Sequence, residues 1–192
     1  SSNLKKQEGD YTDMYFNYGL QYDLRDSSFN TKNGYVALFN QELPVVSENN
    51  EIVNSFVLTN YKELNKSSEM VGRASLFLKT INTIDGSDVR ISKRGNIPYS
   101  RLRGFERGKV GPVDGSDYIG GNYISALNLS TNIPGLLPTI EILDFNYFID
   151  IANVWGVDYN DALDNSKMRS STGIGLNVIS PIGPISFSLS SV

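Results

Sequence analysis

The chain has 192 residues, a formal net charge of -4, and neither cysteine nor histidine. The absence of cysteine excludes a disulfide framework and a thiolate metal site, and the absence of histidine removes the commonest catalytic base and metal ligand. An acidic balance argues against a nucleic-acid surface, because binding phosphates requires a net basic face. No window approaches the roughly 20 consecutive apolar residues of a membrane-spanning helix, which excludes a helical membrane protein.

Alternation of apolar and polar residues predicts strands along most of the chain, because successive strand side chains point to opposite faces. The first segment begins at Met14, where Phe16, Tyr18 and Leu20 alternate with Asn17 and Gly19. Three further segments have strand composition but weaker alternation, and four later ones alternate clearly. In chain order these seven segments are Tyr35–Leu43, Val53–Leu64, Val71–Ile81, Tyr123–Ile133, Leu143–Ile151, Gly173–Val178 and Ile185–Ser190.

The polar face of these segments decides between two kinds of all-β fold. In a soluble sandwich the outward face would be charged, whereas here it consists mainly of uncharged Ser, Asn and Gly with an occasional Asp. A barrel wall that shows one face to lipid and the other to its lumen fits this pattern better. We therefore predict an antiparallel transmembrane β-barrel fragment with about eight strands of roughly 9 to 11 residues, and rank the sandwich second.

The predicted connections alternate between short and long, as in bacterial barrels with short periplasmic turns and longer outer loops. Ser180–Pro184 and Pro134–Pro138 read as tight turns, while 156–169 is longer and 84–120 is the longest. Reading the long connections as outer loops puts Arg25–Gly34 and Leu64–Glu69 on the periplasmic side.

The longest connection carries the motif Arg103-Gly104-Phe105, followed by Gly111-Pro112 and by Gly120-Gly121-Asn122 at the start of a strand. This ordered set resembles the Arg-Gly-Phe loop of the BamA family of outer-membrane assembly factors. Further matches to that family follow the same order and extend the resemblance over nearly the whole chain. They lie at Tyr22–Asp26 with Asn33-Gly34, at Phe148–Trp155, and at Arg169–Pro184.

The resemblance implies that residues 1–192 form the C-terminal part of an outer-membrane β-barrel of the bacterial surface antigen type, integral to the Gram-negative outer membrane. We expect about strands eight to fifteen of a 16-stranded barrel, without POTRA repeats and without the final strand. Because such a piece leaves two unpaired edges, it should appear as an open curved sheet. The resemblance also implies that the long loop folds back into the lumen.

A loop arginine inside a barrel needs an acceptor, because an unpaired buried guanidinium is costly and a forked pair with a carboxylate is a strong remedy. Asp150 lies on the polar register of its strand and is the candidate partner of Arg103. Asn128, which stands where relatives usually carry Glu, is expected to accept a hydrogen bond from Arg103 without neutralising it. Gly104 would allow a positive φ or a close approach, and Phe105 would wedge the loop against the wall.

Other loop residues receive more ordinary interpretations. Arg101, Arg107 and Lys109 are expected to be solvated or to face lipopolysaccharide. Trp155 and Tyr159 are read as an interfacial aromatic girdle. The loop carboxylates match no known calcium loop and are read as solvated charge; they are Asp114, Asp117, Asp158, Asp161 and Asp164.

The resemblance implies a role in assembling and inserting β-barrel proteins, with the Arg-Gly-Phe loop bracing the barrel. No enzymatic activity, cofactor or metal is expected. The expected partners are unfolded outer-membrane protein clients, lipids with lipopolysaccharide, and accessory assembly lipoproteins, but no nucleic acid. The alternative is a polypeptide-secreting transporter of the same superfamily, as in two-partner secretion or a TamA-like protein. A passive porin is a weaker alternative, and an attached lipase is disfavoured because the chain has no Gly-x-Ser-x-Gly elbow.

Overall fold

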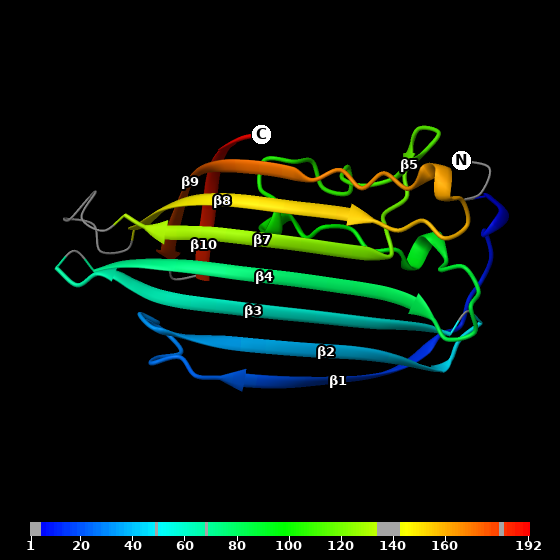
Figure 1. Ribbon diagram of the computed structural model, residues 1–192, viewed down its shortest axis with the longest axis horizontal. Helices are drawn as coiled ribbons and strands as arrows, with labels where there is room; N and C mark the ends of the chain where they lie inside the picture. The colour runs from blue at the N-terminus through cyan, green and yellow to red at the C-terminus, as the bar shows by residue number, and fades with distance from the viewer. Residues whose placement is uncertain (1–4, 49, 68, 134–142, 181–182) are drawn as a thin grey trace.

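The computed structural model describes residues 5–48, 50–67, 69–133, 143–180 and 183–192. Within this part an eight-stranded antiparallel sheet has the order β1-β2-β3-β4-β7-β8-β9-β10 and curves without closing (Figure 1). Its strands are β1 (Met14–Asp23), β2 (Gly34–Val46), β3 (Glu51–Asn65), β4 (Met70–Thr83), β7 (Tyr123–Asn132), β8 (Leu143–Trp155), β9 (Arg169–Ser180) and β10 (Gly183–Ser191). The predicted all-β fold, with an open curved sheet, is confirmed.

The strands are longer than the sequence suggested, reaching 15 residues in β3 and 14 in β4. The three segments with weak alternation are strands β2, β3 and β4, as predicted. One end of the sheet carries the connections at 24–33 and 66–69, and the other carries 47–50, 84–122 and 156–168 (Figure 1). The grouping agrees with the prediction, which placed 25–34 and 64–69 opposite to 84–120 and 156–169, although the short connection 47–50 lies on the side of the long loops. The predicted turn at Pro134–Pro138 lies outside the described residues.

The register gives each face of the sheet a continuous set of side chains. Ser75 on β4 lies opposite Asn128 on β7, which in turn lies opposite Asp150 on β8. All three are buried, and the Thr59 hydroxyl lies 2.9 Å from that of Ser75 on the same face. This face is the concave, lumenal one, because the long connection covers it.

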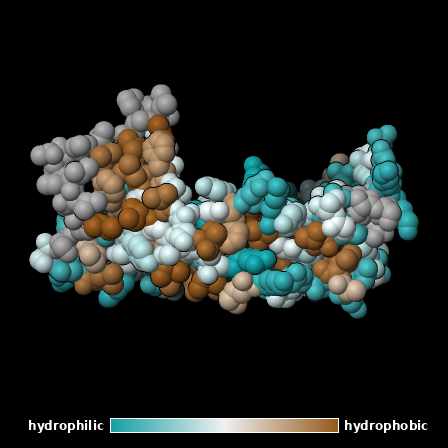
Figure 2. Space-filling model, turned by 90° about the horizontal axis from the view of Figure 1, so that it is seen from above, coloured by the Kyte–Doolittle hydropathy of each residue, from teal (hydrophilic) through white to brown (hydrophobic). Residues whose placement is uncertain are grey.

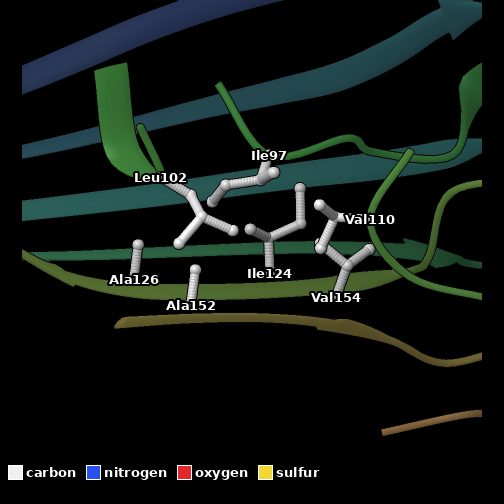
Figure 3. Packing of buried hydrophobic residues seen from close by; sticks show 7 residues of the cluster. All are labelled: Ile97, Leu102, Val110, Ile124, Ala126, Ala152 and Val154. Atoms are coloured by element: carbon white, nitrogen blue, oxygen red, sulfur yellow. The ribbon is translucent and has the colours of Figure 1, made fainter. Parts of the chain in front are cut away.

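The connection from β4 to β7 crosses the lumenal face and contains η1 (Ile91–Lys93), η2 (Tyr99–Arg101), β5 (Val113–Asp114) and β6 (Asp117–Tyr118). Figure 3 shows loop side chains packed onto small and branched side chains of the wall. The cluster comprises Ile97, Leu102 and Val110 from the loop, Ile124 and Ala126 from β7, and Ala152 and Val154 from β8. The wall under the loop is therefore apolar, unlike the mostly polar lumenal face that alternation predicted, because the loop removes this patch from water.

The opposite face of the sheet presents apolar residues to the outside, among them Phe16, Leu78, Leu127 and Leu129, which all remain exposed. In Figure 2 hydrophobic residues are spread along the length of the molecule, and hydrophilic ones are prominent at the right-hand end. Outward-facing apolar residues are expected on a wall in contact with lipid. Across the described ranges, no helix has the length and apolarity needed to traverse a bilayer.

Candidate functional site: the lumenal loop and its anchors

Arg103 and Asp150 form a forked ion pair beneath the loop. Arg103 Nε donates to Asp150 Oδ2 at 2.7 Å, and Nη2 donates to Oδ1 at 2.7 Å. The backbone N–H of Arg103 donates to Oδ2 as well, at 3.1 Å. The Asp150 side chain is 0% exposed and that of Arg103 is 20% exposed. This carboxylate therefore holds both the side chain and the backbone of the motif.

The aromatic ring of Phe148 supports the same guanidinium. The Arg103 Cζ lies 3.4 Å from the centroid of this ring, which is fully buried on β8 two residues before Asp150. A cation over an aromatic face is attracted by the electrons of the ring, and the flat guanidinium can stack there while its edge remains free to donate. The sequence resemblance pointed to the carboxylate but not to this aromatic platform.

Asn128 has a different role from the one expected. Its Nδ2 donates to Asp150 Oδ1 at 2.8 Å and to the Arg101 carbonyl at 2.9 Å, and its Oδ1 accepts from Arg101 Nη1 at 3.2 Å. The expectation that Asn128 accepts from Arg103 is therefore wrong. The cross-strand pairing of Asn128 with Asp150 directs the amide at the carboxylate, so Asn128 acts on Arg103 through Asp150.

Arg101 was expected to be solvated or to face lipopolysaccharide, and this expectation is wrong. Its Nη1 donates to the buried Ser75 hydroxyl at 2.8 Å, and its guanidinium lies 5.2 Å from the centroid of the Phe77 ring. Burial, together with the nearby charge of Arg73, lowers the pKa of Arg101. Arg107 and Lys109 are exposed, and Lys109 pairs with Glu106 at 2.9 Å.

Gly104 and Phe105, the next two residues of the motif, fix the turn of the loop against the wall. Gly104 has a φ of +89°, and a Cβ built there would lie 2.5 Å from Ser190 Oγ on β10, so both the backbone conformation and the space favour glycine. Phe105 packs against the apolar cluster of Figure 3. The motif thus lies between β8 and β10.

The residues that lead the loop back into the wall also make specific contacts. Gly95 and Gly121 exchange backbone hydrogen bonds of 2.8 and 3.0 Å, and Asn122 Nδ2 donates to Asp158 Oδ2 at 2.9 Å. Pro112 is fully buried and its carbonyl accepts from Ile119 at 3.1 Å. Gly111 and Gly120 both have a positive φ. These residues, singled out as the strand start, form the loop's return path.

Arg94 is an anchor that sequence reasoning missed. Its side chain is 0% exposed; it forms an ion pair with Asp158, and Nη1 donates to the Gly156 carbonyl at 2.9 Å. Burial acts to raise the pKa of Asp158, but hydrogen bonds from Val89 and Asn122 and the charge of Arg94 bring it below its ordinary value. Asp158 was read as solvated charge, which is wrong.

Arg90 is a second missed anchor, at the β1 side of the sheet. Its Nε donates to the buried Glu51 carboxylate at 3.3 Å, and it also pairs with Asp13. Its guanidinium lies 4.3 Å from the centroid of the Tyr11 ring. The hydrogen bond from Arg90, assisted by Lys93, lowers the pKa of Asp13. No pattern in the sequence indicated these partners of Arg90.

Two other loop expectations need correction. The Tyr159 hydroxyl donates to Asp114 at 3.0 Å and its ring lies 5.1 Å from the Arg94 Cζ, so it belongs to the loop packing and not to a girdle. The prediction for Trp155 is not contradicted: this residue lies beside Tyr123 on the outward register, with ring centroids 5.7 Å apart. Asp164 also has a partner, the Gly156 N–H at 2.9 Å. Among the described residues no group of three His, Cys, Asp or Glu could hold a metal.

Beside the loop, the lumenal face is hollowed by a half-open cavity of about 910 Å³. Its lining includes Arg73, Arg101, Arg103 and Asn128, together with Asp144. The arrangement has no nucleophile paired with a base among these residues. Three charged side chains fix the long loop: Arg90 and Arg103 hold it to wall strands β3 and β8, and Arg94 holds it to the connection after β8.

The open antiparallel barrel wall agrees with comparisons to known proteins. The model of the Omp85 superfamily domain matches residues 1–191. The chain belongs to the Omp85 superfamily. A curated Omp85 relative is the outer membrane protein assembly factor BamA of Neorickettsia risticii (strain Illinois), which is 28% identical over 113 residues, covering 57% of this chain and 15% of the relative.

Among solved Omp85 structures, the crystal structure of BamA from Haemophilus ducreyi lacking POTRA domains 1–3 superposes with a TM-score of 0.80 and 25% identity. The match covers 92% of this chain and 38% of that one. The chain thus spans well under half the length of both relatives. The predicted membership of the BamA superfamily is confirmed, and with it the location as an integral β-barrel protein of the outer membrane.

Proposed function

We propose that the protein assembles and inserts β-barrel proteins into the bacterial outer membrane, and that its Arg-Gly-Phe loop braces the barrel wall during this work. The observation that carries the loop's role is the forked Arg103–Asp150 pair, in which the carboxylate is completely buried. Removing either partner would leave a charge without compensation in the wall. Both named relatives are BamA proteins, which favours assembly over polypeptide secretion.

The proposed mechanism needs no covalent chemistry. Membrane strands cannot leave backbone N–H and C=O groups unpaired in hydrocarbon, so a client strand enters most easily by adding to an exposed strand edge. A barrel that exchanges strands at an edge must keep the rest of its wall intact. The loop supports this by joining β3, β8 and the connection after β8 through Arg90, Arg103 and Arg94. Unfolded barrel proteins are the proposed clients, and assembly lipoproteins the proposed accessory partners.

The test is a charge swap in the full-length protein. Arg103→Asp places a carboxylate beside Asp150, and we expect it to deplete other β-barrel proteins from the outer membrane. Arg103→Asp combined with Asp150→Arg restores an opposite-charge pair and should recover them in part or fully. The exposed Arg107→Asp is the matched control for a change of loop charge. A silent Arg103→Asp, with normal amounts of the protein itself, would overturn the bracing role.

A secretion transporter makes a different prediction in the same strains. If the protein exported one polypeptide, Arg103→Asp would reduce that polypeptide outside the cell and leave the other outer-membrane barrels at normal levels. Quantifying outer-membrane and secreted proteins together therefore separates the two functions.

A further inference from the structure

A hollow on the outer face of the wall is unrelated to the loop. It has a volume of about 340 Å³ and lies over β3, β4, β7 and β8, near the end with the short connections. The small residues Gly72 and Ala74 of β4 form its floor. Gly72 lies opposite Lys62 of β3 and Ala74 lies opposite Leu129 of β7, so larger side chains stand on both sides. Its apolar lining includes Leu64, Leu129 and Ile149.

The register shows that this hollow faces lipid. On β4, Ser75 contacts the lumenal residues Thr59 and Arg101, so its neighbour Ala74 points to the opposite face. Leu129 and Ile149 likewise alternate with the lumenal Asn128 and Asp150, which are hydrogen-bonded to each other. In an integral outer-membrane protein the neighbour of this face is the bilayer.

Polar groups at the rim define the chemistry of the occupant. Lys62 is exposed at the hollow and forms no ion pair within the described ranges, and Asn60 and Thr131 provide uncharged hydrogen-bonding groups. Lysine near a membrane interface extends its ammonium toward the headgroups while its methylene chain covers apolar surface. An apolar trough with a cation at its interfacial end complements one acyl chain below an anionic headgroup.

We infer that this hollow binds an anionic glycerophospholipid of the periplasmic leaflet. One acyl chain lies over Gly72 and Ala74, and the phosphate pairs with Lys62. The leaflet follows from the position of the hollow beside the connection at 66–69, on the side of the short turns. The inference needs only the outer-membrane location and is independent of the proposed assembly function.

The experiment measures lipid binding to the purified full-length protein by native mass spectrometry. Dioleoyl phosphatidylglycerol is the probe, dioleoyl phosphatidylcholine tests the headgroup charge, and inorganic phosphate is added as a competitor. We expect one phosphatidylglycerol to bind more tightly than phosphatidylcholine, with Lys62→Gln weakening it about fivefold. Ala74→Leu should abolish this binding by filling the trough. Free phosphate should compete poorly, because it lacks the acyl chain.

Two variants provide matched controls. Lys66→Gln removes an exposed lysine from the neighbouring connection, and Ala37→Leu enlarges an alanine on the outer face of β2. Both should bind the lipid like the parent. The inference is overturned if Lys62→Gln and Ala74→Leu bind phosphatidylglycerol like the parent while remaining folded barrels, if the controls weaken binding equally, or if phosphatidylcholine binds as tightly. Since none of these readouts involves client proteins, failure here would leave the assembly function standing.

Discussion

Asn128 and Asp150 face each other across β7 and β8, and the Asn128 amide donates to the Asp150 carboxylate at 2.8 Å. The same carboxylate receives three hydrogen bonds from Arg103. Since the Asn128 amide also donates to the Arg101 carbonyl, one side chain joins the wall strand, the ion pair and the loop backbone. The loop is thus fixed by a network whose members depend on one another.

Asn128→Ala should weaken this network without removing a charge. It deprives Asp150 and the Arg101 carbonyl of a donor in a site where Asn128 is only 3% exposed. Leaving buried groups unsatisfied costs about 1–3 kcal/mol, which we expect as a lower free energy of unfolding in urea titrations of the full-length protein in lipid. The exposed Asn17→Ala on β1 is the control and should change little. Equal stability of both variants would contradict the network.

Arg103→Lys tests whether the fork, and not only the charge, holds the loop. A lysine has one ammonium and cannot reproduce the two parallel bonds from Nε and Nη2, nor stack flat on Phe148. Losing a charge-assisted hydrogen bond costs about 1.5–3 kcal/mol. We expect faster proteolysis within residues 84–122 than in the parent, and no change for Arg107→Lys. Unchanged proteolysis of Arg103→Lys would show that charge alone suffices.

Arg94→Met should release the other end of the loop. The substitution keeps an apolar side chain in a completely buried position but leaves Asp158 without its cation and the Gly156 carbonyl without a donor. Breaking a fully buried pair costs about 3–5 kcal/mol. Because the Asp158 side chain is 28% exposed, water relieves part of this, and we expect about 2–3 kcal/mol. The rate of hydrogen exchange of the loop amides measures this loss of stability. Lys109→Met, which breaks the exposed pair with Glu106, is the control.

The sequence predicted the strands well because alternation is a local property: Leu143 to Ile151 shows its two faces without any knowledge of its neighbours. It predicted the contact between Arg103 and Asp150 because the motif and the polar register could be combined. It could not reveal Arg90 or Arg94 as anchors, since Asp13 lies 77 residues from Arg90, and Asp158 lies 64 residues from Arg94. Such pairs depend on how the loop crosses the sheet.

The same limit explains the error about the lumenal face. Ala126 and Ala152 share the register of Asn128 and Asp150, which alternation assigned to the polar, lumenal face, but Leu102 packs over both strands there. A small residue on a strand can face open solvent or leave room for a side chain from another segment. The sequence of the strand does not distinguish these two cases. Only the path of the loop distinguishes them.

Acid should loosen the loop through Asp13 and Asp158. The pKa of both carboxyls lies below the ordinary value of 3.8 in the folded protein. A group with a lowered pKa stabilises the folded state fully above its unfolded pKa and loses this contribution as the pH falls through the folded pKa. Loop hydrogen exchange, corrected for its intrinsic pH dependence, should therefore be constant from about pH 7 to 5 and increase below about pH 4. A transition centred above pH 5 would contradict this assignment.

Gly121→Ala should prevent the loop from returning into the wall. A Cβ at this position would lie 2.3 Å from the Trp155 carbonyl oxygen and 2.9 Å from the Trp155 nitrogen, and backbone atoms cannot move aside as a flexible side chain can. Either β8 must shift, or the paired hydrogen bonds between Gly95 and Gly121 must break. We expect less heat-stable folded barrel on semi-native gels.

Gly108→Ala is the control that separates a steric clash from backbone strain. Gly108 has a φ of +75° but nothing within 4 Å of its Cβ position, so only strain of about 1–2 kcal/mol applies. If Gly121→Ala were no more harmful than Gly108→Ala, the close contact between the loop return and β8 would not be essential for folding.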